Sequence, residues 1–183
     1  MRRRTLAMLM IGILMVLGFA GCGGGHDKVD RGEDSYAMSL YNAKNPYIEN
    51  TSANNDLVRL LGVNSIGKYT LNVIDDDHPF TLEIRFMYLH GDVDQASLQQ
   101  RMTNIGVALM SLIRDCEQVN WSYPSDAGLV EGTIGVDYAN EILATDLKAA
   151  GKDEAKFAAL CERLFPDKMG ADDGEASEEG AQQ

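Results

Sequence analysis

The spacing of apolar side chains changes in the middle of the chain, and this change restricts the folds that the sequence can adopt. In residues 69–73 and 80–88, apolar and polar side chains alternate, which is typical of strands with one buried face. Residues 75–79 between them consist of three aspartates, a histidine and a proline, a composition that favours a turn. The pattern predicts two antiparallel strands joined by that turn.

The next segment has the spacing of a helix. Asp92 and Gln95 resemble a capping box, and apolar residues then recur at intervals of four and three, namely Leu98, Met102, Ile105, Leu109, Leu112 and Cys116. This stripe is too short for a coiled coil, so we expect the helix from Asp92 to Cys116 to pack into a core. Residues 119–123 alternate again and indicate a third strand.

Shorter helices are expected on both sides of this region. Asn55 or Asp56 can cap a short helix over residues 57–61, because both residue types favour the position that precedes a helix. Apolar spacing further along the chain predicts one helix over residues 137–151 and another over residues 153–164.

Three glycines separate the third strand from these last helices. Gly128, Gly132 and Gly135 lack the Lys-Ser/Thr ending of a phosphate-binding loop, and we interpret them as a surface loop. The whole pattern predicts a single α+β domain. Its sheet has about three strands, is mainly antiparallel, and is packed on one face by the long helix, with smaller helices around it.

The first residues have the three parts of a secretory signal peptide. Three arginines precede a nearly unbroken apolar run at residues 6–20, and Ala20-Gly21-Cys22 follow. The run is shorter than the roughly 20 residues that a membrane-spanning helix needs. Its end resembles a lipobox, the motif before a cysteine that receives lipid. We therefore expect residues 1–21 to be removed and Cys22 to carry the lipid; the alternative is an ordinary secretory signal with an incidental cysteine.

A lipidated Cys22 predicts a protein held on the extracytoplasmic face of the cell membrane, because two acyl chains anchor a protein stably. Residues 22–35 are rich in glycine and charge and are expected to form a flexible tether. Residues 36–166 would be the globular domain. Residues 167–183 carry six acidic side chains and one lysine, which indicates a disordered acidic tail.

The charge of the chain excludes some partners. The net charge is −12, and the predicted signal peptide contains three arginines and no acidic residue, so the remainder is still more acidic. Such a surface repels nucleic acid and anionic lipid headgroups. We therefore expect contact with the membrane only through the lipid on Cys22, and no nucleic-acid partner.

Five segments follow one another in the first half of the expected domain. They are Asn45-Pro46-Tyr47-Ile48, the polar stretch at residues 50–55, the helix at 57–61, the strand at 69–73 and residues 79–86. Together they resemble a family of bacterial domains of unknown function, number 4825. The resemblance covers about residues 44–145. It implies a small lipoprotein or a domain like the outer region of BlaR-type sensors, with a role linked to envelope sensing and with no catalytic residue assigned.

The sequence contains few candidate catalytic or metal-binding residues. Three aspartates beside His78 could hold a divalent cation, but they lack the spacing and glycine of an EF-hand, and a turn explains the same residues. No serine or cysteine occurs in a known catalytic motif, so we assign no catalytic residue, metal or cofactor. Cys116 and Cys161 lie on apolar helix faces. We predict two free buried thiols, with a disulfide as the alternative.

One face of the predicted sheet is a candidate partner surface. If the apolar residues of each strand face the core, their polar neighbours Thr81, Glu83 and Arg85 lie on the opposite face. Arg85 could bind an acidic partner, although a solvated face that contacts nothing is the simpler interpretation. We expect a non-catalytic binding or sensing module of the cell envelope, with an unknown envelope protein or ligand as its partner. The alternative is an envelope enzyme that acts on cell-wall or peptide substrates.

Overall fold

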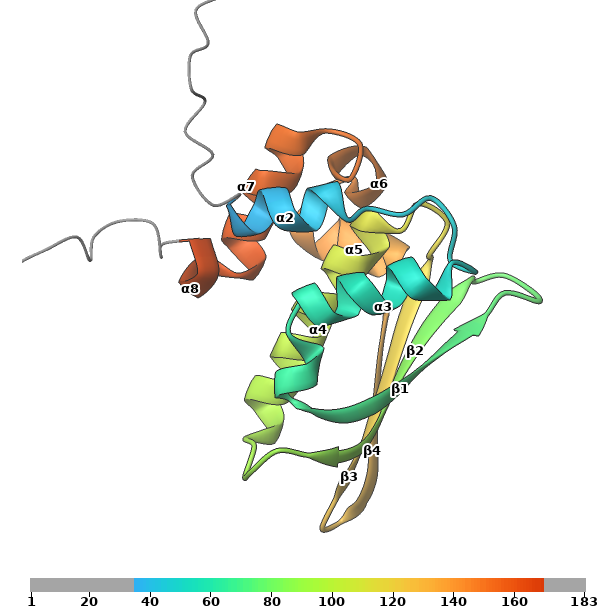
Figure 1. The fold of residues 1–183 in the computed structure, drawn as a ribbon, viewed down its shortest axis with the longest axis vertical. Coiled ribbons are helices and arrows are strands. Elements are labelled where there is room, and N and C mark those ends of the chain that lie inside the picture. Colours follow the sequence, from blue (N-terminus) through green and yellow to red (C-terminus); the bar gives the residue numbers. More distant parts are fainter. Residues whose placement is uncertain (1–34, 170–183) are drawn as a thin grey trace, which may run out of the picture. The chain divides into compact units, whose positions relative to one another are not determined.

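The computed structural model describes residues 35–169. The predicted signal peptide, the lipid site Cys22, nearly all of the tether and residues 170–183 of the predicted tail lie outside the described residues. Between Ser35 and Met169 the chain contains four strands, several α-helices and one 3-10 helix. The predicted α+β class is confirmed (Figure 1).

The sheet has the order β1-β2-β3-β4. Its strands are β1 (Gly67–Ile74), β2 (Thr81–Leu89), β3 (Gln118–Ser125) and β4 (Gly128–Gly135). Two of the pairings are antiparallel, β1 with β2 and β3 with β4, whereas β2 and β3 are parallel. The predicted hairpin at residues 75–79 therefore exists, and a helix connects the two hairpins because parallel neighbours need a crossover.

The prediction of a surface loop at the three glycines is wrong, because they lie in β4. Trp121 of β3 pairs with Gly132 of β4, and a side chain at position 132 would overlap the indole ring. Gly128 has a φ of 122° at the start of the strand, where the chain turns back after β3. Glycines at such positions break the alternation of apolar and polar residues, and this hides the fourth strand in the sequence.

The crossover helix α4 spans Gln95–Leu112 and covers one face of the sheet. Asp94, and not Asp92, caps it, because its carboxylate accepts the Ser97 amide at 2.8 Å. The predicted apolar stripe is buried from Leu98 to Leu112. At Gly106 the helix lies so close to β3 and β4 that an added Cβ would meet Ile134. Cys116 follows the helix and is still buried.

The remaining helices are short and pack at the sides and one end of the sheet (Figure 1). They are α2 (Tyr36–Asn42), α3 (Thr51–Leu60), the 3-10 helix η1 (Val63–Ser65), α5 (Val136–Leu143), α6 (Leu147–Ala150), α7 (Glu154–Leu164) and α8 (Pro166–Met169). The helix α3 begins earlier than predicted, because the side chain of Asn50 accepts the Ala53 amide and caps it. No helix among the described residues is long and apolar enough to cross a membrane.

Two differences from the predicted helices concern the C-terminal region. The expected helix over residues 137–151 is two helices, because Ala144 adopts a φ of 48° and Asp146 caps a new helix. Asp153 caps α7, and Pro166 follows the end of that helix. Pro166 then begins α8, a position that its fixed φ favours. Helical structure therefore continues to Met169 and includes the first three residues of the predicted acidic tail.

Candidate functional site

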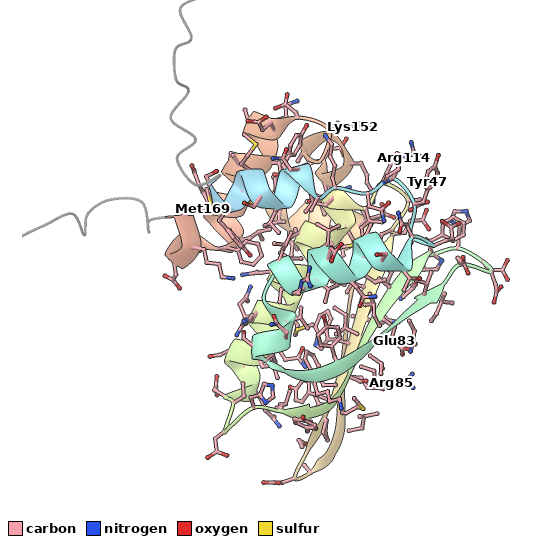
Figure 2. The ribbon with its side chains drawn as sticks, in the orientation of Figure 1. Tyr47, Glu83, Arg85, Arg114, Lys152 and Met169 are labelled. Carbon is pink, nitrogen blue, oxygen red and sulfur yellow. The ribbon has the colours of Figure 1, made fainter. Side chains whose placement is uncertain are left out.

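The predicted partner surface lies on the sheet face opposite α4. The apolar neighbours Leu82, Ile84 and Phe86 are buried in the core, and the side chains between them point the other way. Arg85 is exposed and Glu83 is partly exposed. Figure 2 labels both on the side of the sheet away from the helices. Thr81 is only 3% exposed, and its hydroxyl donates to the Pro79 carbonyl at 2.7 Å. It therefore offers little area to a partner.

Arg85 and Glu83 form an ordered pair rather than an isolated positive charge. The Nη2 of Arg85 donates to both carboxylate oxygens of Glu83, at 2.9 and 3.0 Å. Asn72 on the neighbouring strand donates to the same carboxylate at 3.0 Å. The bonds from Asn72 and Arg85 lower the pKa of Glu83 below its usual value. The row Asn72-Glu83-Arg85 is thus held in place before any partner arrives.

A second polar row lies on the same face. Asn120 accepts hydrogen bonds from Gln118 at 3.0 Å and from Thr133 at 2.7 Å. Around these residues and Glu131 the surface forms a shallow hollow of about 410 Å³. The two rows run across all four strands and together form the polar sheet face.

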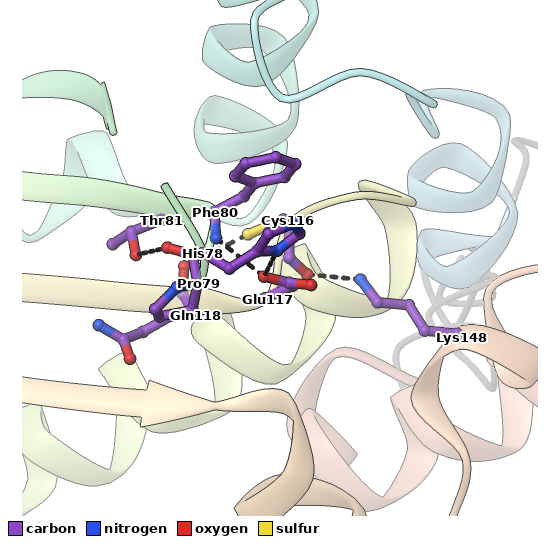
Figure 3. A network of polar contacts seen from close by, with 8 residues as sticks. All are labelled: His78, Pro79, Phe80, Thr81, Cys116, Glu117, Gln118 and Lys148. Atoms are coloured by element: carbon purple, nitrogen blue, oxygen red, sulfur yellow. Dashed lines mark hydrogen bonds and ion pairs between the residues drawn. The ribbon is translucent and has the colours of Figure 1, made fainter. Parts of the chain in front are cut away.

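His78 of the hairpin turn contacts Glu117 and not the neighbouring aspartates (Figure 3). Its Nδ1 lies 2.7 Å from Oε2 of Glu117, and the same oxygen accepts the Phe80 amide at 2.9 Å. The hydrogen bond from His78 is the main cause that lowers the pKa of Glu117. Residues 35–169 contain no cluster of three or more acidic, histidine or cysteine side chains arranged to hold a metal ion. The histidine therefore fixes the turn to the start of β3.

Both cysteines of the domain are buried free thiols. Burial raises the pKa of Cys116 to about 11 and that of Cys161 to about 12. The Cys116 thiol also donates to the Gln118 carbonyl at 3.4 Å. Because the thiolate is the nucleophilic form, both side chains are inert at neutral pH.

The C-terminal end of α4 is capped by a lysine from another helix. Nζ of Lys148, in α6, donates to the carbonyls of Met110 at 2.6 Å, of Ile113 at 3.0 Å and of Cys116. Burial lowers the pKa of this ammonium, whereas three acceptors and the negative end of the helix dipole favour its charged form. All three of its hydrogens are used, so Lys148 contributes charge to its surroundings and no further donors.

A buried asparagine pair shapes the loop beside this lysine. Asn45 is 3% and Asn54 is 0% exposed, and the Nδ2 of Asn45 donates to Oδ1 of Asn54 at 2.9 Å. Asn54 in turn donates to the Ile48 carbonyl, and the Ile48 amide donates to Asp115 at 2.7 Å. These bonds position Asn45-Pro46-Tyr47-Ile48 against the end of α4. In the sequence this motif is recognisable only as part of the family resemblance, because its structural role depends on contacts with α3 and with the end of α4.

The loop, the end of α4 and helix α6 enclose a pocket of about 380 Å³. Four basic residues contribute to its lining, Lys44, Arg114, Lys148 and Lys152. The other lining residues are Asn45, Pro46, Ser111, Leu112 and Gly151, and no acidic residue lines it. We call this feature the basic pocket.

Comparison with known proteins identifies a family for most of the described domain. The family model of a domain of unknown function (DUF4825) matches residues 40–136. The chain belongs to this family. No curated protein and no solved structure matches the chain.

The DUF4825 match contains only part of the basic pocket. The matched residues include α3, α4 and the whole sheet, and they end as α5 begins. Lys44, Asn45 and Arg114 lie within the match, whereas Lys148 and Lys152 lie after it. The sequence interpretation missed the pocket because its basic residues are far apart in the chain.

Proposed function

We propose that this protein is a lipid-anchored, extracytoplasmic binding or sensing module of the cell envelope that does not perform catalysis. The polar sheet face is the observation that carries this proposal. Thr70, Asn72, Arg85, Glu131 and Thr133 are exposed on it, and its two rows of hydrogen bonds fix several of its side chains in advance. Fixed side chains lose less entropy on binding, which favours recognition of a partner.

Arg85 is the residue on this face best suited to recognise an acidic partner. Its side chain is 58% exposed, and Glu83 engages only Nη2. A guanidinium carries five N–H donors in a fixed plane, so the donors on Nε and Nη1, which point in different directions, can each donate to an acceptor of a partner.

The anchoring part of the proposal is tested at Cys22. Cys22→Ser should abolish labelling of the protein by a fatty acid and leave the protein unprocessed or poorly retained at the membrane, because the thiol is the expected site of the lipid. Equal labelling of the variant and the wild type would show that Cys22 is not lipidated. An ordinary secretory signal predicts a protein that is cleaved, unlabelled and soluble in both forms.

The binding part is tested at Arg85. Arg85→Glu replaces the donors by a carboxylate, so proteins recovered by in-cell crosslinking to the wild type should be lost while the circular dichroism spectrum stays unchanged. Lys156→Glu makes the same change of charge at an exposed position on α7 and should retain the crosslinked proteins. An unchanged set of crosslinked proteins in a folded Arg85→Glu variant would exclude this face as the binding surface.

A further inference from the structure

We propose that the basic pocket binds a small organic anion, a carboxylate or phosphate attached to a short apolar or aromatic body. The pocket is a separate site from the polar sheet face, and the inference does not depend on a protein partner at that face. Its volume of about 380 Å³ is in the range of pockets that bind small molecules, roughly 300–1,000 Å³.

The charge of the pocket is opposite to that of the protein. The chain has a net charge of −12, yet four basic and no acidic residues line this pocket. Among residues 35–169, none of the four takes part in an ion pair. Unpaired cations gathered around a concave site raise the local concentration of anions.

Nearby acidic side chains are already occupied by backbone amides. The carboxylate of Asp115 accepts the Ile48 amide, that of Asp146 caps α6 and that of Asp153 caps α7. Each holds a local turn or helix end in place, and none lines the pocket. These carboxylates keep their charge, and those of Asp115 and Asp146, together with that of Glu117, act on Lys148 through space. Among residues 35–169 none of them forms an ion pair with Lys44, Arg114 or Lys152.

Lys148 has a particular part in this arrangement. The last carbonyls of α4 form the negative end of a helix dipole at the base of the pocket, which would repel an anion. The ammonium of Lys148 binds three carbonyls in this region. It thereby offsets their negative charge and leaves the other three cations for a ligand.

Two of these cations are held over aromatic rings. The Arg114 guanidinium lies 5.3 Å from the centre of the Tyr47 ring, and Nζ of Lys44 lies 3.7 Å from the centre of the Tyr41 ring. Figure 2 shows Arg114, Tyr47 and Lys152 at the same end of the molecule. Pro46, Leu112 and the alkyl chains of the lysines provide apolar walls, so one part of a ligand would meet charge and another part would meet hydrocarbon.

The experiment is a titration of the full chain, purified as the cell produces it, and followed by ligand-observed NMR. The probes are benzoate and phenyl phosphate, compared with neutral benzamide, cationic benzylammonium and inorganic phosphate. We expect both aromatic anions to bind with a dissociation constant on the order of 1 mM, as suits ligands of this size. Benzamide and benzylammonium should bind at least about tenfold more weakly, because they lack the charge-assisted hydrogen bonds.

The source of the anion is distinguished by the same series. Equal binding of inorganic phosphate and phenyl phosphate would support a site for phosphate itself and overturn the requirement for an apolar body. Preference for benzoate assigns a carboxylate ligand, and preference for phenyl phosphate assigns a phosphate ester. The proposal is overturned if neither aromatic anion binds at a ligand concentration about ten times the expected dissociation constant.

Substitutions of the lining residues test whether the anions bind in the basic pocket. Arg114→Glu and Lys152→Glu change exposed side chains, so the fold should persist, and each should weaken binding of the aromatic anions about tenfold or more. Lys68→Glu makes the same change of charge at an exposed position on β1 and should bind as the wild type does. Equal weakening in all three would show a general effect of net charge and would overturn the site. If a glutamate variant fails to fold, Arg114→Gln and Lys152→Gln provide the same comparison.

These results are independent of the crosslinking experiment at Arg85. Loss of anion binding in the pocket variants with retention of the crosslinked proteins would establish the pocket and leave the sheet face as the protein surface. Retention of anion binding in Arg85→Glu is expected, because Arg85 does not line the pocket.

Discussion

Gly132 on β4 leaves the space that the indole ring of Trp121 on β3 occupies. The two residues pair directly across the strands, and a Cβ at position 132 would overlap the indole atoms Cε2, Cζ2 and Nε1. The indole Nε1 donates to Gln99 of α4 at 2.9 Å. The glycine therefore permits a contact that ties the sheet to its helix.

Gly132→Ala should lower the free energy of unfolding by about 1–3 kcal/mol, the cost of overpacking a filled site. Chemical denaturation followed by tryptophan fluorescence measures this, because Trp121 is the only tryptophan. Gly135→Ala is the matched control, since a Cβ there meets nothing within 4 Å, and it should be nearly neutral. A Gly132→Ala variant as stable as the control would contradict the close approach.

Lys148→Met should destabilise the domain by about 1–3 kcal/mol, because it leaves partly buried carbonyl groups at the end of α4 without their donor. Methionine retains most of the apolar part of the lysine side chain, so the change in stability mainly reports the loss of the ammonium group. Lys152→Met, at an exposed neighbour, should change the stability by no more than about 0.5 kcal/mol. Equal denaturation midpoints for the two variants would show that the cap contributes nothing.

Acid should weaken the domain through Glu117 and Glu83, whose pKa values in the folded state lie below the usual value. A carboxyl group whose pKa is lowered by folding stabilises the folded state fully at any pH above its pKa in the unfolded chain, about 4.5. This stabilisation is lost as the pH falls through the lower pKa of the folded state. Glu117→Gln should therefore be less stable than the wild type at pH 7 and should approach it on acidification.

Glu131→Gln is the control for this measurement, because its side chain is exposed and makes no hydrogen bond among residues 35–169. Denaturation midpoints at several pH values compare the three proteins. A difference in denaturation midpoint between the wild type and Glu117→Gln that stays constant from pH 7 to below the pKa that Glu117 has in the folded protein would contradict this prediction. That result would show that the bonds to His78 and Phe80 do not stabilise the carboxylate.

Cys116 and Cys161 should resist alkylation in the folded protein at neutral pH and react fully in denaturant. Burial raises both pKa values, to about 11 and about 12, so almost no thiolate is present, and access is blocked as well. Intact-mass analysis would show no label on these two residues before denaturation and two labels after it. A protein that takes no label in denaturant would contain a disulfide.

The fold class follows from the sequence because its main elements are strongly periodic. The two alternating strands and the apolar stripe of α4 each have one buried face, and their spacing indicates that face. The fourth strand was missed because Gly128, Gly132 and Gly135 interrupt its alternation. The break between α5 and α6 was missed because Ala144 has no local signal for a positive φ, and Ala favours continued helix.

The candidate sites differ in how far the sequence predicts them. Alternation along β2 placed Glu83 and Arg85 on the face opposite the core, and the structure places them there. It did not indicate that Asn72 of β1 would donate to Glu83 of β2, because the register between two strands is a tertiary property. The basic pocket was missed since Lys44, Arg114 and Lys148 come together only when α6 packs on α4.

The cap on α4 comes from outside the segment that matches the family. Lys148 and Lys152 come from residues after the segment shared with DUF4825, yet they complete a helix and a pocket that begin inside it. The matched segment by itself therefore holds neither the ammonium that satisfies the last carbonyls of α4 nor two of the four basic residues that line the pocket.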